Sequence, residues 1–325
     1  MHPRRRTLAA LAASLSFGTL LAAAQRNAGP ARVGWLSYVA DPDPALALLR
    51  EGLRELGQVE GKTFVIVARF ADGDFSRVPS LIDELAGERI EILVTRGPSA
   101  HFTKAISARI PVVFAFSGDP IEAGFGDSLQ KPGRNMTGIT FMAMELSAKR
   151  VEVLKELVPK VTRIALLSNP EHAGELSEYR VTEETARRLG VTTTRYLVRA
   201  PQELAAAFAT IRASKPDAMI VFPDSFTFAR RREIAEFAAQ ARIPSLYGWT
   251  EFADAGGLAS YGPALTENFK ALSVFVDKIL KGADAGKLPI EQVRRIGFTF
   301  NLVAAKALGM TVPPSMLLRA DRVIE

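Results

Sequence analysis

The stretch PVVFAFSGDPIEAGFGDSLQKPGRNMTGIT, residues 111–140, is the part of the chain that decides its expected fold. It opens with an apolar run over residues 111–116, which predicts a buried strand. The run ends in the turn-forming cluster SGDP, residues 117–120, whose side chains are short and polar. Ligands of open α/β sheets bind at the carboxyl ends of strands, so this turn is a candidate binding loop. These residues alone leave open an ordinary strand–loop–strand segment without a ligand.

Strand and helix patterns alternate on the N-terminal side of this stretch. Apolar and β-branched runs predict strands over residues 33–38, 63–70 and 90–95. Helices are expected after each of them, over about residues 44–56, 74–87 and 99–109. Strands that alternate with helices in this way form a mostly parallel sheet with helices on both faces.

The same alternation restarts after residue 141. Strands are expected over residues 161–168, 191–198, 217–222 and 243–247, with helices between them that include residues 201–214 and 226–241. A length of 325 residues also suggests two domains rather than one. The sequence therefore predicts an α/β protein of two doubly wound, mostly parallel-sheet lobes.

The C-terminal part is too short to form a third core. It predicts a strand over residues 256–263, a long helix over 265–281, and a strand over 295–300 followed by a short helix that Asn301 caps. These elements must complete the two existing lobes, so the chain crosses between the lobes more than once and forms a multi-segment hinge.

This pattern predicts where each lobe begins and ends. We expect an N-terminal lobe of residues 32–141 plus about 262–290, and a C-terminal lobe of residues 145–260 plus about 295–325. The hinge segments are expected near residues 141–145, 258–264 and 284–295.

The first 24 residues have the three parts of a secretory signal peptide. Three arginines at positions 4–6 precede a short apolar, Ala-rich stretch, and small residues end it at Ala24. The stretch is short for a membrane span, although an uncleaved anchor and the twin-arginine export route stay open as alternatives. We expect cleavage after Ala24 and a location in the periplasm.

Composition excludes several classes of partner and site. The mature chain would carry 38 basic and 35 acidic residues, a formal charge of +3, which does not call for nucleic acid or an anionic membrane. The sequence has no cysteine, so disulfides, thiolate metal sites and a cysteine nucleophile are excluded. With His101 and His172 far apart in the sequence, we expect neither a metal nor a cofactor.

Several longer segments together resemble one family of exported proteins. They are REGLRELGQVEGK (residues 50–62), FADGD (70–74), VTRGPSA (94–100), IPVVFAFSGDPIEAGF (110–125), SLQKPGRNMTGIT (128–140), LLSNPE (166–171) and AKALGMTVPPSMLLRADRVIE (305–325). The chain is similar to the substrate-binding proteins of ABC importers, in particular the family that includes tryptophan-binding lipoproteins. The resemblance covers nearly all of the mature chain.

This resemblance implies a type I periplasmic-binding fold with two α/β lobes, three segments between them, and a small-molecule ligand in the cleft. It also implies an ABC permease in the inner membrane as partner, and we expect the protein to be a monomer. The chain departs from the lipoprotein members because it lacks the lipidated cysteine, and it has Arg96 and Arg109 where the family pattern does not require arginine.

Candidate ligand contacts are the residues expected at the carboxyl ends of strands in both lobes. From the first lobe these are Tyr38, Asp41, Arg96, Gly97, Pro98, Ser99, Ser117 and Asp119. From the second lobe they are Asn169, Glu171, Asp224, Ser225, Phe226, Tyr247 and Trp249.

Their residue types suggest specific roles. A carboxylate could bind at Gly97 and Ser99 before the expected helix, with Arg96 as a bidentate clamp. Asp224 or Glu171 could face an amine. The aromatic side chains of Tyr38, Phe226 and Trp249 could stack on a flat ligand.

Structural roles are the alternative for most of these residues. Asp41, Ser99 and Asp224 are also suitable helix caps, and Asp119 and Asn135 suit their turns. Tyr38 and Trp249 could belong to the cores of the lobes. The arginine run at positions 230–232 fits a solvated helix face, with docking to a permease as the second interpretation.

The leading hypothesis from the sequence is a solute-binding protein rather than an enzyme. No G-x-S-x-G, phosphate-binding glycine motif or H-E-x-x-H occurs. A periplasmic sensor domain, and an enzyme that uses carboxylates such as Asp119 and Asp224, stay as alternatives. The tryptophan-binding relatives favour an amino acid or an aromatic compound as the ligand.

Overall fold

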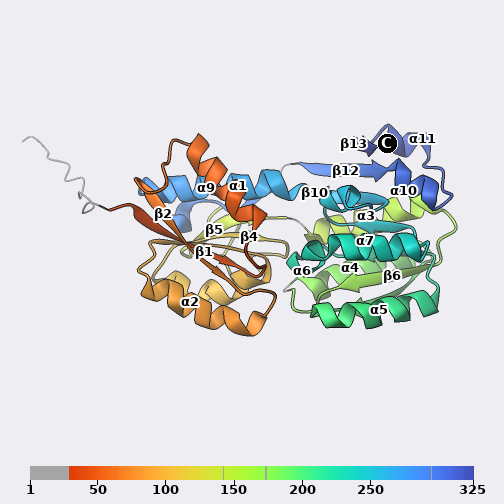
Figure 1. Cartoon of the computed structure of the whole chain (residues 1–325), viewed down its shortest axis with the longest axis horizontal. Coiled ribbons are helices and arrows are strands. Elements are labelled where there is room, and N and C mark those ends of the chain that lie inside the picture. Colours follow the sequence, from red (N-terminus) through yellow and green to blue (C-terminus); the bar gives the residue numbers. More distant parts are fainter. Residues whose placement is uncertain (1–28, 142, 173, 294) are drawn as a thin grey trace, which may run out of the picture.

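The computed structural model describes residues 29–325 apart from 142, 173 and 294, and shows two α/β bodies side by side along the long axis of the molecule (Figure 1). The expected signal peptide, residues 1–24, lies outside the described residues. Within them, no helix is both long and apolar enough to cross a membrane.

The first body is built on a six-stranded sheet in the order β11-β5-β4-β3-β1-β2, and its neighbouring strands pair in parallel. Its strands are β1 (Ala31–Ser37), β2 (Phe64–Phe70), β3 (Ile92–Arg96), β4 (Val112–Phe116), β5 (Met136–Thr140) and β11 (Glu291–Gln292). β4, which the apolar run of residues 112–116 forms, is buried over its whole length between β3 and β5.

The second body is built on a seven-stranded sheet in the order β13-β12-β10-β9-β8-β6-β7. β10 and β12 pair antiparallel, and the other pairs recorded among the described strands are parallel. Its strands are β6 (Arg163–Ser168), β7 (Thr192–Leu197), β8 (Ala218–Val221), β9 (Ser245–Tyr247), β10 (Ala259–Pro263), β12 (Ile296–Asn301) and β13 (Arg322–Ile324). The predicted fold class, two mostly parallel sheets in an α/β protein, is confirmed.

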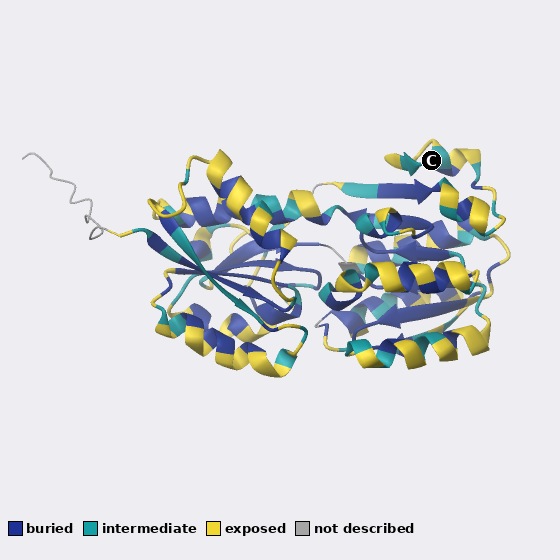
Figure 2. Ribbon diagram, viewed as in Figure 1, coloured by how far each residue is buried: buried dark blue, intermediate teal, exposed yellow. Residues whose placement is uncertain are grey.

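Helices cover both faces of each sheet because successive strand residues point to opposite sides. In the first body α1 and α9 lie on one face and α2 on the other, and in the second body α3 and α4 lie opposite α5 and α7 (Figures 1 and 2). Their bounds are α1 (Pro44–Glu55), α2 (Val78–Gly87), α3 (Ala143–Leu157), α4 (Glu175–Arg188), α5 (Pro201–Ser214), α7 (Arg231–Gln240) and α9 (Leu265–Leu280). The shorter helices are α6 (Ser225–Ala229), α8 (Glu251–Asp254), α10 (Leu302–Ala307) and α11 (Pro314–Leu317).

α9 belongs to the first body although it follows β10 of the second. It packs against α1 at Gly52, where an added Cβ would lie 2.3 Å from the Oγ of Ser273 and 2.8 Å from a backbone oxygen. The ammonium of Lys270 on α9 also contacts Glu51 and Glu55 of α1. Glycine at position 52 therefore lets the two helices approach each other closely.

The chain passes between the two sheets three times. It does so between β5 and α3, between β10 and α9, and between β11 and β12. We propose that these three passages are the hinge, and that the first lobe takes in about residues 264–292 besides its N-terminal part.

Three local features differ from the prediction. The helix expected over residues 99–109 is instead two 3₁₀ segments, η2 (Gly97–Lys104) and η3 (Ile106–Ala108). Hydroxyl groups favour this tight winding, because Thr103 donates to the carbonyl of Ala100 and Ser107 to that of Lys104, each three residues earlier. The helix expected over residues 226–241 is interrupted at Arg230, and the strand expected from residue 256 begins at Ala259.

Candidate functional site

The carboxyl ends of the two sheets face each other, and the loops that follow them are in contact. An added Cβ on Gly97, after β3, would lie 2.4 Å from the Oγ of Ser225 on the second lobe. An added Cβ on Gly174 would lie 2.9 Å from the Cα of Gly118, which follows β4. The structure therefore represents a closed arrangement in which small residues allow the two backbones to touch.

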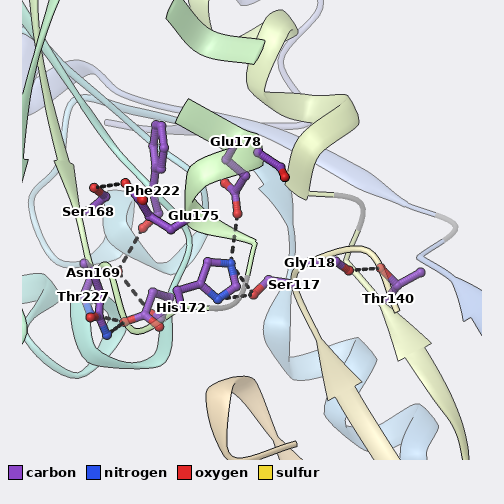
Figure 3. Close-up of polar contacts among 12 residues, drawn as sticks. Ser117, Gly118, Thr140, Ser168, Asn169, His172, Glu175, Glu178, Phe222 and Thr227 are labelled. Atoms are coloured by element: carbon purple, nitrogen blue, oxygen red, sulfur yellow. Dashed lines mark hydrogen bonds and ion pairs between the residues drawn. The ribbon is translucent and has the colours of Figure 1, made fainter. Parts of the chain in front are cut away.

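A polar contact joins the lobes beside these glycines (Figure 3). The Oγ of Ser117 lies 3.2 Å from the Nε2 and 3.4 Å from the Nδ1 of His172. The same Nε2 lies 2.9 Å from the Oε1 of Glu178 on α4. Ser117 was expected at the site, whereas His172 was considered only as a metal ligand and Glu178 was not considered at all.

Several buried polar atoms near these loops have no partner among the described residues. In the first lobe they are the hydroxyls of Thr95 and Ser99, and both residues have no exposed surface. In the second lobe they are the Oδ2 of Asp224 and the indole nitrogen of Trp249. Leaving a buried polar group unpaired costs about 1–3 kcal/mol, so each of these atoms is a candidate for a contact with a ligand.

Asp224 has a structural role and a free oxygen at the same time. Its Oδ1 caps α6, because it accepts hydrogen bonds from the backbone N–H of Phe226 at 2.7 Å and of Thr227 at 3.4 Å. The same oxygen accepts from the side-chain amide of Asn169 at 3.2 Å. The Oδ2 has none of these partners. Asp224 is 2% exposed, so the carboxylate is held rigidly with one oxygen available.

Tyr38 lies on the first lobe within electrostatic reach of Asp224. Its hydroxyl donates to the carbonyl of Gly73 at 2.7 Å, and its ring stacks on Phe75 with 4.0 Å between centroids. Burial raises the pKa of Tyr38 well above its ordinary value, and the negative charges of Asp224 and Asp74 add to this rise. The sequence predicted Tyr38 as a ligand contact or a core residue, and the structure buries it in the hydrophobic core within reach of charges of the second lobe.

The guanidinium of Arg96 is paired with a carboxylate of the protein, so it is not free to bind the carboxylate of a ligand. Its Nε and an Nη each lie 3.3 Å from an oxygen of Asp43, and its guanidinium lies 5.0 Å from the centre of the Phe269 ring. Asp43 also caps α1 by accepting from the N–H of Ala45 at 3.0 Å. The cap is therefore Asp43, and Asp41, for which a capping role was considered, is exposed.

This ion pair carries a stability prediction. Replacing Asp43 by alanine would leave the guanidinium of Arg96 buried without its counter-charge and would remove the cap of α1. Breaking a buried pair costs about 3–5 kcal/mol, so we expect the thermal midpoint to fall on the order of 10 °C. The matched control is Asp41→Ala, two residues earlier on the exposed surface, which we expect to change the midpoint little. Equal melting of both variants and the parent would contradict this account of Arg96.

The remaining candidates have other environments. Asp119 fixes its turn by accepting from the N–H of Ile121 and Glu122, and Glu171 is exposed, 3.8 Å from Arg199. Pro98 follows Gly97 in η2, and Ser225, the first residue of α6, lies against Gly97. Three aromatic residues are buried: Phe226 in the core, Tyr247 stacked on Phe252, and Trp249 edge-on to Phe141.

The structure therefore groups the candidates in two sets. Those where the lobes meet or beside a free polar atom are the buried residues Tyr38, Pro98, Ser99, Ser117, Asn169, Asp224 and Trp249 and the half-buried residues Gly97 and Ser225. Those at the rim, in a turn, in an ion pair or in the core are Asp41, Arg96, Asp119, Glu171, Phe226 and Tyr247. Over the part of the chain that the structure describes, no three His, Asp or Glu side chains are grouped so as to hold a metal ion.

Comparison with known proteins identifies the family. Residues 43–324 match the family described as ABC transporter substrate binding protein. A tyrosine-binding protein from Clostridioides difficile (strain R20291) is 22% identical over 274 residues, which cover 82% of this chain and 78% of that protein.

Two solved structures are similar over nearly the whole chain. One is an ABC domain in complex with L-Trp from Streptococcus pneumoniae, with a TM-score of 0.80 and 26% identity over 90% of this chain and 100% of that one. The other is a conserved domain protein from Vibrio cholerae O1 biovar El Tor, with a TM-score of 0.82 and 25% identity over 90% of this chain and 99% of that one. These matches confirm the expected type I periplasmic-binding fold. The chain belongs to the family of ABC transporter substrate-binding proteins.

Proposed function

We propose that this protein is the exported solute-binding component of an ABC importer. It captures a small molecule between its two lobes and delivers it to a permease in the inner membrane when the hinge opens again. The proposal places the mature protein in the periplasm, as a monomer with no cofactor.

The observation that carries the proposal is the free Oδ2 of Asp224. This oxygen is buried, belongs to a carboxylate that the cap of α6 and Asn169 hold in place, and has no partner among the described residues. A buried carboxylate oxygen of this kind is a suitable partner for an ammonium group. On the opposite lobe the free hydroxyls of Thr95 and Ser99 are suitable donors to a carboxylate.

The surrounding side chains favour an amino acid, in particular one with an aromatic side chain. Tyr38 with Phe75, and Trp249 with Phe141, are aromatic pairs at the places where the lobes meet. The relatives named above as a tyrosine-binding protein and a complex with L-Trp support the same class of ligand. We therefore propose an amino acid or an aromatic compound as the ligand.

The alternatives rest on weaker observations. Ser117, His172 and Glu178 are the residue types of a catalytic triad, but Glu178 bonds the Nε2 that is also the nitrogen nearest to Ser117. In a triad the acid holds one ring nitrogen and the serine bonds the other. We therefore propose that the protein is not an enzyme. A sensor domain shares the fold and differs in its partner, so it is distinguished by which membrane protein the closed form binds.

Thermal melting against a panel of ligands tests the proposal. The mature chain, unfolded and refolded to remove bound molecules, is melted with amino acids, aromatic acids, sugars and purines. A ligand at a hundred times its dissociation constant stabilises by about 2.7 kcal/mol, which raises the midpoint by several degrees. We expect this shift with an aromatic amino acid. No shift with any compound would contradict the binding function, and a shift only with sugars or purines would contradict the proposed ligand class.

A further inference from the structure

A short segment of the second lobe, residues 249–251, contacts the first lobe beside the passages between the sheets. We call these three residues the pivot segment. The segment leads from the end of β9 into α8. Its first residue, Trp249, is 3% exposed, and its ring lies edge-on to that of Phe141 with 5.1 Å between centroids. Phe141 directly follows β5 and belongs to the first lobe, because its N–H donates to the carbonyl of Phe116 at 2.8 Å. The pivot segment therefore touches the first passage.

The last residue of the pivot segment bonds the chain at the second passage. The Oε1 of Glu251 accepts a hydrogen bond from the backbone N–H of Leu265 at 2.8 Å. Leu265 is the first residue of α9, and Ala264 before it provides no side-chain cap. The first N–H groups of a helix have no partner within the helix, and the positive end of the helix dipole favours a carboxylate. A carboxylate of the second lobe therefore caps a helix of the first lobe.

The middle residue of the pivot segment lies against the third passage. An added Cβ on Gly297, the second residue of β12, would lie 2.9 Å from the Cγ2 of Thr250. The hydroxyl of Thr250 also donates to the Oε2 of Glu251 at 3.3 Å. At the same passage Arg295 lies 3.6 Å from Glu267 on α9. The three residues of the pivot segment thus each contact a different passage between the lobes.

Both partners of the Glu251 bond belong to firmly packed parts of their lobes. α8 is fixed on the second lobe, because the ring of Phe252 stacks on Tyr247 with 4.4 Å between centroids and the amide of Asn301 donates to the carbonyl of Ala253 at 3.1 Å. α9 is fixed on the first lobe by its contacts with α1. A bond beside the point where the chain crosses changes its length little when the two lobes rotate about that point. Such a bond restrains the axis of rotation and leaves the rotation itself free.

We propose that Glu251 is a positioning residue for closure, and that its bond to Leu265 fixes the point about which the two lobes rotate. This inference deepens the proposed function, on which it rests. Without the bond, the second passage gains conformational freedom that closing must remove again, because contacts such as that of Gly118 with Gly174 require one arrangement of the lobes. Fixing the backbone of one further residue lowers the population of the closed state about five- to thirtyfold.

Three substitutions at this one position test the role of Glu251. Glu251→Ala removes the acceptor. Glu251→Asp keeps the charge but shortens the side chain by one methylene, which moves the carboxylate out of reach of Leu265, whereas Glu251→Gln keeps an acceptor oxygen at the original reach. Asp254→Ala is the matched control, because Asp254 is the last residue of α8, is exposed, and pairs with Arg322 of the second lobe.

Energy transfer in single molecules measures closure without any ligand. Because the chain has no cysteine, Lys62→Cys and Arg187→Cys on the exposed surfaces of the two lobes can be labelled with a donor and an acceptor dye. We expect the parent, Glu251→Gln and Asp254→Ala to give the same distribution of transfer efficiency, and Glu251→Ala and Glu251→Asp to give a wider one.

Affinity is measured on the same variants by calorimetric titration with L-phenylalanine, L-tyrosine and L-tryptophan. We expect Glu251→Ala and Glu251→Asp to weaken binding about five- to thirtyfold, and Glu251→Gln to bind as the parent does. Thermal melting without ligand shows how much of the change is a loss of stability, since a cap that only stabilises α9 lowers the midpoint and leaves closure and affinity unchanged.

The outcomes separate this inference from the proposed function. If Glu251→Ala has the transfer distribution and the affinity of the parent, the pivot is overturned and ligand binding stands, whatever happens to the melting point. If Glu251→Ala does not fold, the comparison of Glu251→Asp with Glu251→Gln decides in the same way. If none of the three amino acids binds but the distribution widens in Glu251→Ala and Glu251→Asp alone, the pivot stands and the proposed ligand class fails.

Discussion

Replacing Asp224 by alanine is expected to weaken the binding of an amine-bearing ligand by about a hundredfold or more. Its Oδ2 is a buried carboxylate oxygen without a partner among the described residues, and its Oδ1 is committed to Phe226, Thr227 and Asn169. Removing one partner of a buried charged pair costs about 2–5 kcal/mol, and each 1.4 kcal/mol is a factor of ten in affinity. Calorimetric titration of the parent and the variant measures the difference.

Two controls separate the lost contact from a damaged fold. Asp224→Asn keeps an oxygen for the cap of α6 but removes the charge, so it should retain most of the stability and lose most of the affinity. A deaminated analogue of the same ligand should bind the parent and Asp224→Asn equally. If the analogue and the amine both lose affinity to the same extent, Asp224 does not face the amine.

Replacing Gly174 by leucine is expected to weaken the binding of every ligand by about ten- to a hundredfold. Gly174 has φ of −95°, which any residue adopts, so a side chain does not strain the backbone of the second lobe there. In the closed state, however, a Cβ would lie 2.9 Å from the Cα of Gly118 on the other lobe. Overpacking of this kind costs about 1–3 kcal/mol, and a cost confined to the closed state lowers apparent affinity by the same amount.

The melting point of ligand-free protein shows whether Gly174→Leu weakens binding by hindering closure or by destabilising the fold. Gly87→Ala at the end of α2 is the control, because an added Cβ there meets open space. We expect both variants to melt close to the parent without ligand, and only Gly174→Leu to lose affinity. Unchanged affinity in Gly174→Leu would contradict the contact between Gly118 and Gly174 as part of ligand-bound closure.

The sequence predicted the architecture well because the architecture depends on patterns that are local in the chain. Buried parallel strands are continuous apolar runs, such as residues 112–116, and their order follows from alternation with helices. The prediction from the sequence was wrong where the surroundings of a residue decide between similar local structures, such as an α-helix and a 3₁₀ helix. Residues 97–108 look helical by composition, but Pro98 and the hydroxyls of Thr103 and Ser107 accompany 3₁₀ turns instead.

The sequence predicted which positions could form the candidate site, but it did not predict what each residue does there. Loops at strand ends were the correct place to look, but sequence cannot distinguish Asp119, which caps its own turn, from Asp224, which has one oxygen left over. Arg96 and its partner Asp43 are 53 residues apart. Ser117 and His172 are 55 apart and lie on different lobes. Pairings of this kind depend on tertiary structure and have no local signal.

A crystal structure of the mature protein with the compound that shifts melting most tests the central claim directly. The account predicts that this compound lies between the carboxyl ends of the two sheets, with its amine bonded to the Oδ2 of Asp224 and its carboxylate near Ser99 and Thr95. A compound bound outside the cleft, or an Asp224 oxygen bonded only to protein while the cleft is filled, would contradict it.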